Sequence, residues 1–283
     1  MGNIEPIAAN NAEAVWPLSI EAGWNQNVVD WQFMLEAGHG FGVRNEAGIW
    51  KASSLVLPLG QKLAWISMVL VTRARRRSGL GTRLLRRCIE EVKASGAVAG
   101  LDATEQGRPI YLPLGFRDLY KIARWHLGVV RESVSSPPGI VIRPLSSTDL
   151  PKLAIYDQSL SGMERPTLLR HLAGRQPGMA WVAETSSGEL GGFVLGREGR
   201  TASSIGPVVA DSEAIALSLI AKAMTSSQGP FIIDVPETHG EIRRWLEKQG
   251  AVSPRGYMRM TLGTADKLAD PRRVFALAGP ELG

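Results

Sequence analysis

The spacing of apolar positions predicts a buried strand followed by an amphipathic helix within residues 63–94. Leu63–Val71 is apolar almost throughout, which is typical of a strand buried on both faces. After it, apolar residues recur at helical spacing, and arginines and glutamates fill the opposite face. The apolar set is Leu80, Leu84, Leu85, Cys88, Ile89 and Val92. Gly96 is expected to end this helix, because glycine commonly occupies the position after a last helical turn.

Strand and helix signals alternate through the rest of the first half. Strands are predicted at Ala52–Leu57 and Val98–Ala103, with a further strand that begins at Phe116. Helices are predicted at Asn11–Glu21, Val28–Glu36 and Gly107–Leu114. Alternating elements of this kind indicate an α/β (α+β) fold with mixed sheets.

The second half repeats this order of elements with little sequence identity. Strands are predicted at Ala180–Glu184, Gly192–Gly196, Ser204–Val209 and Phe231–Val235, and helices at Glu213–Thr225 and Glu241–Lys248. Gly100–Ala103 and Ile232–Val235 each carry an aspartate at the third position, shortly before a predicted helix. The repetition favours an ancient duplication, and hence two related domains.

A segment rich in Ser, Pro and Gly at residues 133–139 separates the two halves. We therefore expect a first domain at 1–132, a linker at 133–139, a second domain at 140–263 and a tail at 264–283. One helix is predicted in the tail, around Asp270–Leu277.

Composition narrows the class of protein further. Of the 283 residues, 44% are hydrophobic and 21% are charged, as in ordinary globular proteins. The chain has one cysteine and four scattered histidines, so neither a disulfide nor a metal site is expected. Its longest nearly apolar run, Leu63–Val71, has nine residues, whereas crossing a membrane takes about 20. The N-terminal residues lack the pattern of a secretory signal, so a cytoplasmic location is expected.

Positive charge gathers between Arg73 and Arg87, where the chain places seven arginines. The whole chain has a formal net charge of +5, so this local cluster matters more than the total. Such a cluster favours an anionic partner, which leaves nucleic acid, a membrane surface and a polyphosphate ligand as candidates.

The loop that joins the buried strand to the amphipathic helix favours the polyphosphate. A helix start presents unpaired backbone N–H groups and the positive end of the helix dipole. Gly79 and Gly81 have no side chains, so a phosphate can approach the backbone closely. The loop does not match the Walker pattern, since Thr82 and Arg83 follow Gly81 where Lys and Ser or Thr are required. The three-glycine dinucleotide fingerprint is not matched either.

The pattern Arg76-x-x-Gly79-x-Gly81 resembles the acyl-CoA pyrophosphate loop of the GNAT superfamily of N-acetyltransferases. Trp65–Val71 matches the strand that precedes this loop in the family, and Tyr111–Phe116 resembles its downstream Tyr-to-Gly-Phe element. Gly23–Gln26 and Leu101–Thr104 are similar to a tandem subgroup with a degenerate second domain. In the second half, Val209–Glu213 replaces the arginine-glycine loop.

The resemblance implies two GNAT-like domains, each a mixed, mostly antiparallel sheet flanked by helices. Because Asp211 and Glu213 would repel phosphates, one acetyl-CoA site per chain is expected. The implied reaction is direct transfer of an acetyl group to a primary amine, here of a small molecule, in a ternary complex without a metal. The implied CoA-binding residues are Val69, Leu70, Val71, Arg76, Arg77, Ser78, Gly79, Leu80, Gly81 and Thr82.

By the same resemblance, Tyr111 is the general acid that protonates the departing thiolate, and its alternative is a packing aromatic. Asp102 is a candidate base or orienting residue, although it and Asp234 are also placed to cap the helices that follow them. Glu105, Asp157 and Asp234 are the other candidate bases. Trp24, Trp31 and Trp65 are candidates either for an acceptor pocket or for the core. A monomer or homodimer is expected.

Two non-enzymatic functions stay open on the sequence alone. One is an acyl-CoA sensor without turnover, and the other is nucleic-acid binding through the basic helix. No nucleic-acid-binding motif is present and no aromatic residues interleave with the arginines, which favours the acetyltransferase.

Overall fold

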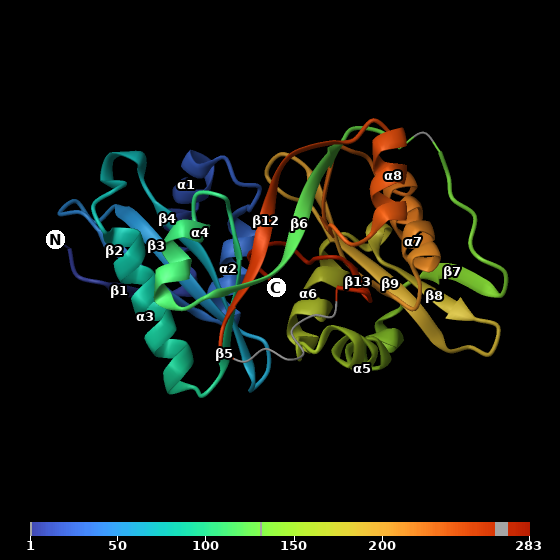
Figure 1. The fold of residues 1–283 in the computed structure, drawn as a ribbon, viewed down its shortest axis with the longest axis horizontal. Coiled ribbons are helices and arrows are strands. Elements are labelled where there is room, and N and C mark those ends of the chain that lie inside the picture. The colour runs from blue at the N-terminus through green and yellow to red at the C-terminus, as the bar shows by residue number, and fades with distance from the viewer. Residues whose placement is uncertain (1, 131, 264–270) are drawn as a thin grey trace.

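One mixed sheet of 13 strands runs through both halves of the chain (Figure 1). The computed structural model describes residues 2–130, 132–263 and 271–283. Only the pairs β4–β5 and β10–β11 are parallel among the described strands, so the sheet is mostly antiparallel, as predicted. Within these ranges no helix combines the length and the apolar character needed to span a membrane.

The first half contains six of the strands. They are β1 (Glu5–Ile7), β2 (His39–Arg44), β3 (Trp50–Pro58), β4 (Leu63–Val71), β5 (Val98–Ala103) and β6 (Arg117–Leu127). Its α-helices are α1 (Ala12–Ala22), α2 (Val28–Ala37), α3 (Leu80–Ala94) and α4 (Arg108–Tyr111).

Both faces of the first-half sheet are covered by helices. Alternate residues of a strand point to opposite sides of a sheet, and in β3 and β4 both sets contain apolar residues that pack against helices. Trp65 and Leu55 pack in one cluster with apolar residues of α1 and α2. Ile66 and Val56 pack in another cluster with the predicted apolar face of α3. Strands buried on both faces are expected to be apolar throughout, which explains the composition of β4.

The second half repeats the order of the first. Its strands are β7 (Ile140–Pro144), β8 (Trp181–Thr185), β9 (Leu190–Arg197), β10 (Ser203–Ala210), β11 (Phe231–Pro236), β12 (Val252–Leu262) and β13 (Val274–Ala276). Its α-helices are α5 (Leu150–Ser161), α6 (Pro166–Arg175), α7 (Glu213–Thr225) and α8 (Gly240–Lys248). Residues 132–139, which include the expected linker, form neither helix nor strand.

Each half gives its last long strand to the sheet of the other. Along the sheet the order is β5, β12, β6, β11, so β12 lies beside β5 of the first half and β6 lies beside β11 of the second. Two buried ion pairs join the exchanged strands to their neighbours. Asp102 of β5 faces Arg259 of β12, and Asp234 of β11 faces Arg124 of β6. The sequence patterns did not predict this exchange.

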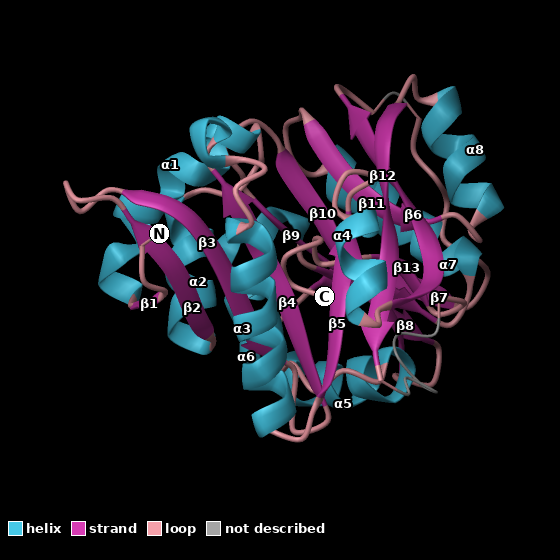
Figure 2. Ribbon diagram, turned by 60° about the vertical axis from the view of Figure 1, so that its left-hand side comes forward, coloured by secondary structure: helices cyan, strands magenta, loops and turns pink. Residues whose placement is uncertain are grey.

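The two parallel strand pairs separate soon after they begin. β4 and β5 pair only over Leu63–Trp65, and β10 and β11 pair only over Ser203–Ile205. Figure 2 shows β4 and β5 close together at one end and apart at the other. In the second half, β13 lies beside β10 beyond the point where β11 leaves it, and pairs with β10 through Val208 and Val209.

The prediction of a helix around Asp270–Leu277 was wrong, because this segment contains strand β13. Val274–Ala276 forms a strand, and residues 271–273 form a turn, whereas Asp270 lies outside the described residues. The residues of this strand are almost completely buried against β10 and β11, and tertiary pairing of this kind overrides a local helical signal.

Candidate functional site

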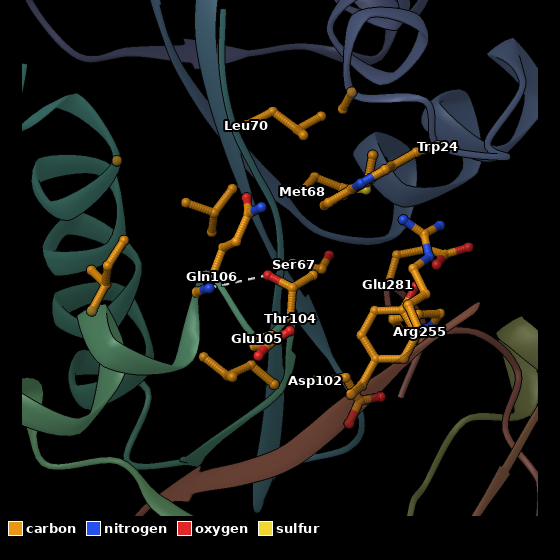
Figure 3. A pocket seen from close by; sticks show the side chains of 18 of the residues that line it. Trp24, Ser67, Met68, Leu70, Asp102, Thr104, Glu105, Gln106, Arg255 and Glu281 are labelled. Atoms are coloured by element: carbon orange, nitrogen blue, oxygen red, sulfur yellow. Dashed lines mark hydrogen bonds between the residues drawn. The ribbon is translucent and has the colours of Figure 1, made fainter. Parts of the chain in front are cut away.

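A pocket of about 630 Å³ opens where β4 and β5 separate. Residues of β4, β5 and the segment between β5 and α4 form its first-half wall. Pro254–Tyr257 and Pro280–Glu281 contribute from the second half and the tail. Figure 3 shows Gln106 and Glu105 on one side of the pocket, Glu281 and Arg255 on the other, and Ser67 of β4 between them. This volume suits a small-molecule site.

An irregularity in β4 shapes the floor of this pocket. The pairing of β3 with β4 shifts register between Ser53 and Leu55, and Met68 has a φ of 52°. A left-handed backbone is uncommon for a residue with a long side chain, so this conformation must be held by its surroundings. The buried Ser53 hydroxyl donates a hydrogen bond of 2.9 Å to the Met68 carbonyl oxygen. β-bulges of this kind re-aim the backbone beside functional sites.

The predicted phosphate loop borders the pocket. Gly79 caps the start of α3 with a φ of 80°, and Arg77 has a φ of 60°. Arg76 donates from Nε to the Val71 carbonyl oxygen at 3.3 Å, which ties the loop to the end of β4. Val69, Leu70, Val71, Arg76 and Gly81 line the pocket, whereas Arg77, Ser78, Gly79, Leu80 and Thr82 lie in the same loop and helix start without lining it.

Space and charge at this loop fit an anionic group. A Cβ atom built on Gly79 would meet nothing within 4 Å, and one on Gly81 would meet only a Val71 methyl, at 3.6 Å. The backbone there is therefore accessible from outside. α3 is 15 residues long, and no acidic residue lies in its first turn. Its N-terminal N–H groups and the adjacent arginines can thus bind the phosphates that the resemblance implies.

Among the described residues, the gap between β10 and β11 in the second half is not open as the gap between β4 and β5 is. Its β10–α7 connection is short and contains Asp211, which pairs with Arg273 of the tail at 2.5 Å. β13 occupies the space where β10 and β11 part, and the Leu277 N–H donates to the Asp234 carbonyl oxygen at 3.0 Å. The chain's own tail therefore fills this gap.

Tyr111 ends α4 and lines the pocket. Burial raises the pKa of its phenol to about 12, so the hydroxyl stays protonated at neutral pH. Its ring lies 6.0 Å from that of Phe116. Gly107 leaves room for the ring, since a Cβ atom there would lie 3.1 Å from the Tyr111 hydroxyl oxygen.

Asp102 lies at the pocket wall with both carboxylate oxygens engaged. Arg259 donates to them from Nε at 2.9 Å and from Nη2 at 2.8 Å. Burial raises the pKa of Asp102, and the attraction of Arg259 opposes that rise. The Arg259 guanidinium also stacks 4.5 Å from the Trp65 ring. This arrangement suits an orienting residue better than a free proton acceptor.

The other candidate bases differ in position. Glu105 is exposed and lines the pocket. Asp157 and Asp234 do not line it, and each is held in a buried bidentate pair, with Arg165 and Arg124 respectively. In the part of the chain that the structure describes, no three His, Cys, Asp or Glu side chains gather as metal ligands would.

The tryptophans divide between site and core. Trp24 is partly buried and lines the pocket, whereas Trp31 and Trp65 are fully buried in the core. Sequence reasoning missed a further group of lining residues, namely Gln26, Ser67, Arg255, Tyr257 and Glu281. Most belong to segments far from the phosphate loop, and no local pattern signals that the fold brings them there.

Both halves of the chain match models of one protein family. Residues 21–116 match the acetyltransferase (GNAT) family, and residues 153–276 match a model described as an acetyltransferase (GNAT) domain. The chain is 26% identical over 231 residues to YitH, an uncharacterized N-acetyltransferase of Bacillus subtilis (strain 168). The aligned region covers 81% of this chain and 80% of YitH.

Solved structures share the fold over nearly the whole chain. A proposed acetyltransferase of Pyrococcus horikoshii has a TM-score of 0.81 at 21% identity, covering 99% of this chain and 95% of that one. A tandem GNAT protein from the clavulanic acid biosynthesis pathway has a TM-score of 0.62 at 15% identity, covering 94% of this chain and all of that one. With a GNAT domain in each half, this protein is a tandem member of the GNAT family of N-acetyltransferases.

Proposed function

We propose that the first half binds acetyl-CoA and transfers its acetyl group to the primary amine of a small molecule. The observation that carries this proposal is the contrast between the two strand gaps. β4 and β5 part to leave a lined pocket beside the arginine-glycine loop, whereas β13 fills the equivalent gap between β10 and β11. This contrast supports one acetyl-CoA site per chain. The proposed domains remain 1–132 and 140–263, with β6 and β12 exchanged between them.

In this proposal the chain divides the binding of acetyl-CoA between β4 and the loop. Arg76, Gly79 and Gly81 would hold the phosphates, together with the other loop residues named above. Val69–Val71 line the pocket beyond the point where β5 leaves β4. Their backbone groups would pair with the pantetheine amides and with the thioester oxygen. A fixed N–H donor aimed at that oxygen contributes about 10²–10³ in rate.

Two residues have assigned tasks near the reacting atoms. Tyr111 would give its proton to the departing sulfur, and its raised pKa keeps that proton available at neutral pH. Asp102 would act as an orienting residue, because it fixes Arg259 and thereby the position of β12 at the pocket wall.

The shape of the pocket supports a small acceptor. Pro254–Tyr257 and Pro280–Glu281 close the side of the pocket that faces the second half. A long peptide lying across the site would have to displace these segments. The second half therefore acts as a wall of the acceptor site in this proposal.

Calorimetric titration of acetyl-CoA tests the first part of the proposal. Arg76→Glu reverses a charge at the pocket, and Arg86→Glu makes the same change at an exposed position of α3 outside the pocket. We expect binding at one site per chain that Arg76→Glu weakens at least tenfold and Arg86→Glu leaves nearly unchanged. Absence of binding to the wild type, or equal loss in both variants, would contradict the proposal.

Release of the CoA thiol tests turnover. Free amino acids, amino sugars and polyamines are supplied with acetyl-CoA, and the thiol is followed with a colorimetric reagent. Acceleration by one class of amine supports the transferase. Tight binding of acetyl-CoA without acceleration by any of them would favour a sensor, and salt-sensitive binding of DNA or RNA in place of acetyl-CoA would favour a nucleic-acid-binding protein.

A further inference from the structure

A carboxylate from the tail lies in the wall of the first-half pocket. Glu281 is only 2% exposed, and it lines the pocket together with residues of β4, β5 and β12. Its Oε1 accepts a hydrogen bond from Arg197. Among the described residues, its Oε2 has no hydrogen-bond partner. A buried carboxylate oxygen without a donor is costly, so it is a position where a ligand can supply one.

The tail holds Glu281 through contacts with both halves. The Trp65 indole N–H of β4 donates to the Pro280 carbonyl oxygen at 2.8 Å, and Arg165 donates to the Gly283 carbonyl oxygen at 2.9 Å. Gly279 has a φ of 136°, and a Cβ atom there would lie 3.0–3.1 Å from both Glu281 oxygens. Glycine at this position therefore lets the tail fold the carboxylate back against itself.

A network of buried charges orients the carboxylate. Arg197 of β9 also pairs with Asp30 of α2 at 3.2 Å, and Asp30 pairs in turn with Arg175 at 2.8 Å. Arg175 further contacts Glu198, whose side chain is 47% exposed and lies outside the pocket. Arg124 and Tyr257 also interact electrostatically with Glu281, and Asp234 and Arg255 lie beside these two residues.

Two more buried oxygens without donors line the same pocket. They are Oε1 of Gln26, which lies after α1, and Oγ of Ser67 on β4. Gln26 is 4% exposed and Ser67 is 7% exposed. Figure 3 shows Ser67 between Gln106 and Glu281. An alkylammonium group carries three N–H donors and a positive charge, which is the chemistry that such a set of oxygens lacks.

We propose that Glu281 binds the ammonium group of the acceptor and takes the proton that must leave before the amine attacks. The inference rests on the proposed function. It names the general base for the amine, since β4 contains no acidic residue that could take that role. Gln26 and Ser67 would accept the remaining ammonium hydrogens and fix the direction of the nitrogen lone pair. The tail thus completes the catalytic site of the first half.

The protons balance as follows. Glu281 takes one proton from the ammonium, and the freed lone pair forms the bond to the acetyl carbon while the carbon–sulfur bond breaks. Tyr111 gives its proton to the sulfur, and the second proton that the nitrogen loses returns to the Tyr111 oxygen. Glu281 then releases its proton to water, so the products are the amide, the thiol and one proton.

The test compares Glu281→Gln with Glu198→Gln, a second carboxylate in the same charge network that lies outside the pocket. The best amine from the thiol-release panel is the acceptor, and kcat/KM is measured as a function of pH. We expect Glu281→Gln to lower kcat/KM by about 10²–10⁴-fold and to remove the rise with pH that reports a carboxylate base. Acetyl-CoA affinity should not change, and Glu198→Gln should behave as the wild type.

Each other outcome bears on the inference. An unchanged kcat/KM in Glu281→Gln overturns it, and so does an equal loss in both variants with a parallel fall in Tm. If Glu281→Gln does not fold, Glu281→Asp must lower kcat/KM at least tenfold. If no panel amine is acetylated, the same amines are titrated into the acetyl-CoA-bound protein. Binding that Glu281→Gln abolishes supports the inference, and any other result overturns it. Failure of the wild type to bind acetyl-CoA instead defeats the proposed function.

Discussion

The ion pair between Asp102 and Arg259 is expected to determine whether β12 stays paired with β5. Both side chains are almost fully buried, with exposed fractions of 0% and 1%, and two hydrogen bonds of 2.8–2.9 Å join them. Asp102→Asn keeps the shape but leaves a buried guanidinium without its counter-charge. Breaking a buried pair in this way costs about 3–5 kcal/mol of unfolding free energy. Urea unfolding followed by tryptophan fluorescence measures the loss.

Two further variants test whether the loss of stability comes from the unpaired charge. Asp102→Leu combined with Arg259→Met removes both charges, and such replacements are commonly neutral or stabilising, so the double variant should return toward wild-type stability. Asp118→Asn, which breaks a solvent-exposed pair with Arg108, should change stability little. The single variants Asp102→Leu and Arg259→Met complete the cycle. If the double variant loses as much stability as these two single variants together, the charges are not coupled and the reasoning fails.

Three other perturbations test separate parts of the structure. Tyr111→Phe should lower kcat by about 10²–10⁴-fold in steady-state assays without changing the affinity for acetyl-CoA measured by calorimetry. A methyl group on Gly206 would lie 1.8 Å from the Leu277 carbonyl oxygen, so Gly206→Ala should displace the tail, cost about 1–3 kcal/mol and speed hydrogen exchange there. Burial lowers the pKa of His239, whose Nε2 lies 3.0 Å from the Val274 carbonyl oxygen. Because the unfolded chain then binds the proton more readily, stability should fall below about pH 6.5, and His239→Gln should flatten that fall in urea titrations at pH 7.5 and 5.5.

Much of the first-half site could be predicted from local patterns in the sequence. The apolar run of β4, the amphipathic face of α3 and the glycines between them can be read from neighbouring residues, and the structure places them as expected. The family comparison confirmed the GNAT domain that this loop and the Tyr111–Phe116 element suggested for the first half. It also confirmed the second GNAT domain, which the repeated order of elements and the likeness to a tandem subgroup suggested.

Contacts between distant segments could not be predicted in the same way. Asp102 and Asp234 were recognised as equivalent positions, but their partners Arg259 and Arg124 lie on strands of the opposite half. Periodicity within a strand says which faces are apolar and does not say which strand will lie beside it. For the same reason nothing near Glu281 indicated a pocket residue, because the route of the tail is set by β10, Arg197 and Trp65.

The exchange of β6 and β12 has a consequence for synthesis. β5 is complete at Ala103, but its neighbour β12 begins roughly 150 residues later along the chain. At typical translation rates the ribosome needs about 7–30 s to make that interval. During this time the nascent first half has an unpaired strand edge, which is a common starting point for aggregation. A chaperone that covers the β5 edge should therefore raise the yield of folded protein more than one that acts only after release from the ribosome.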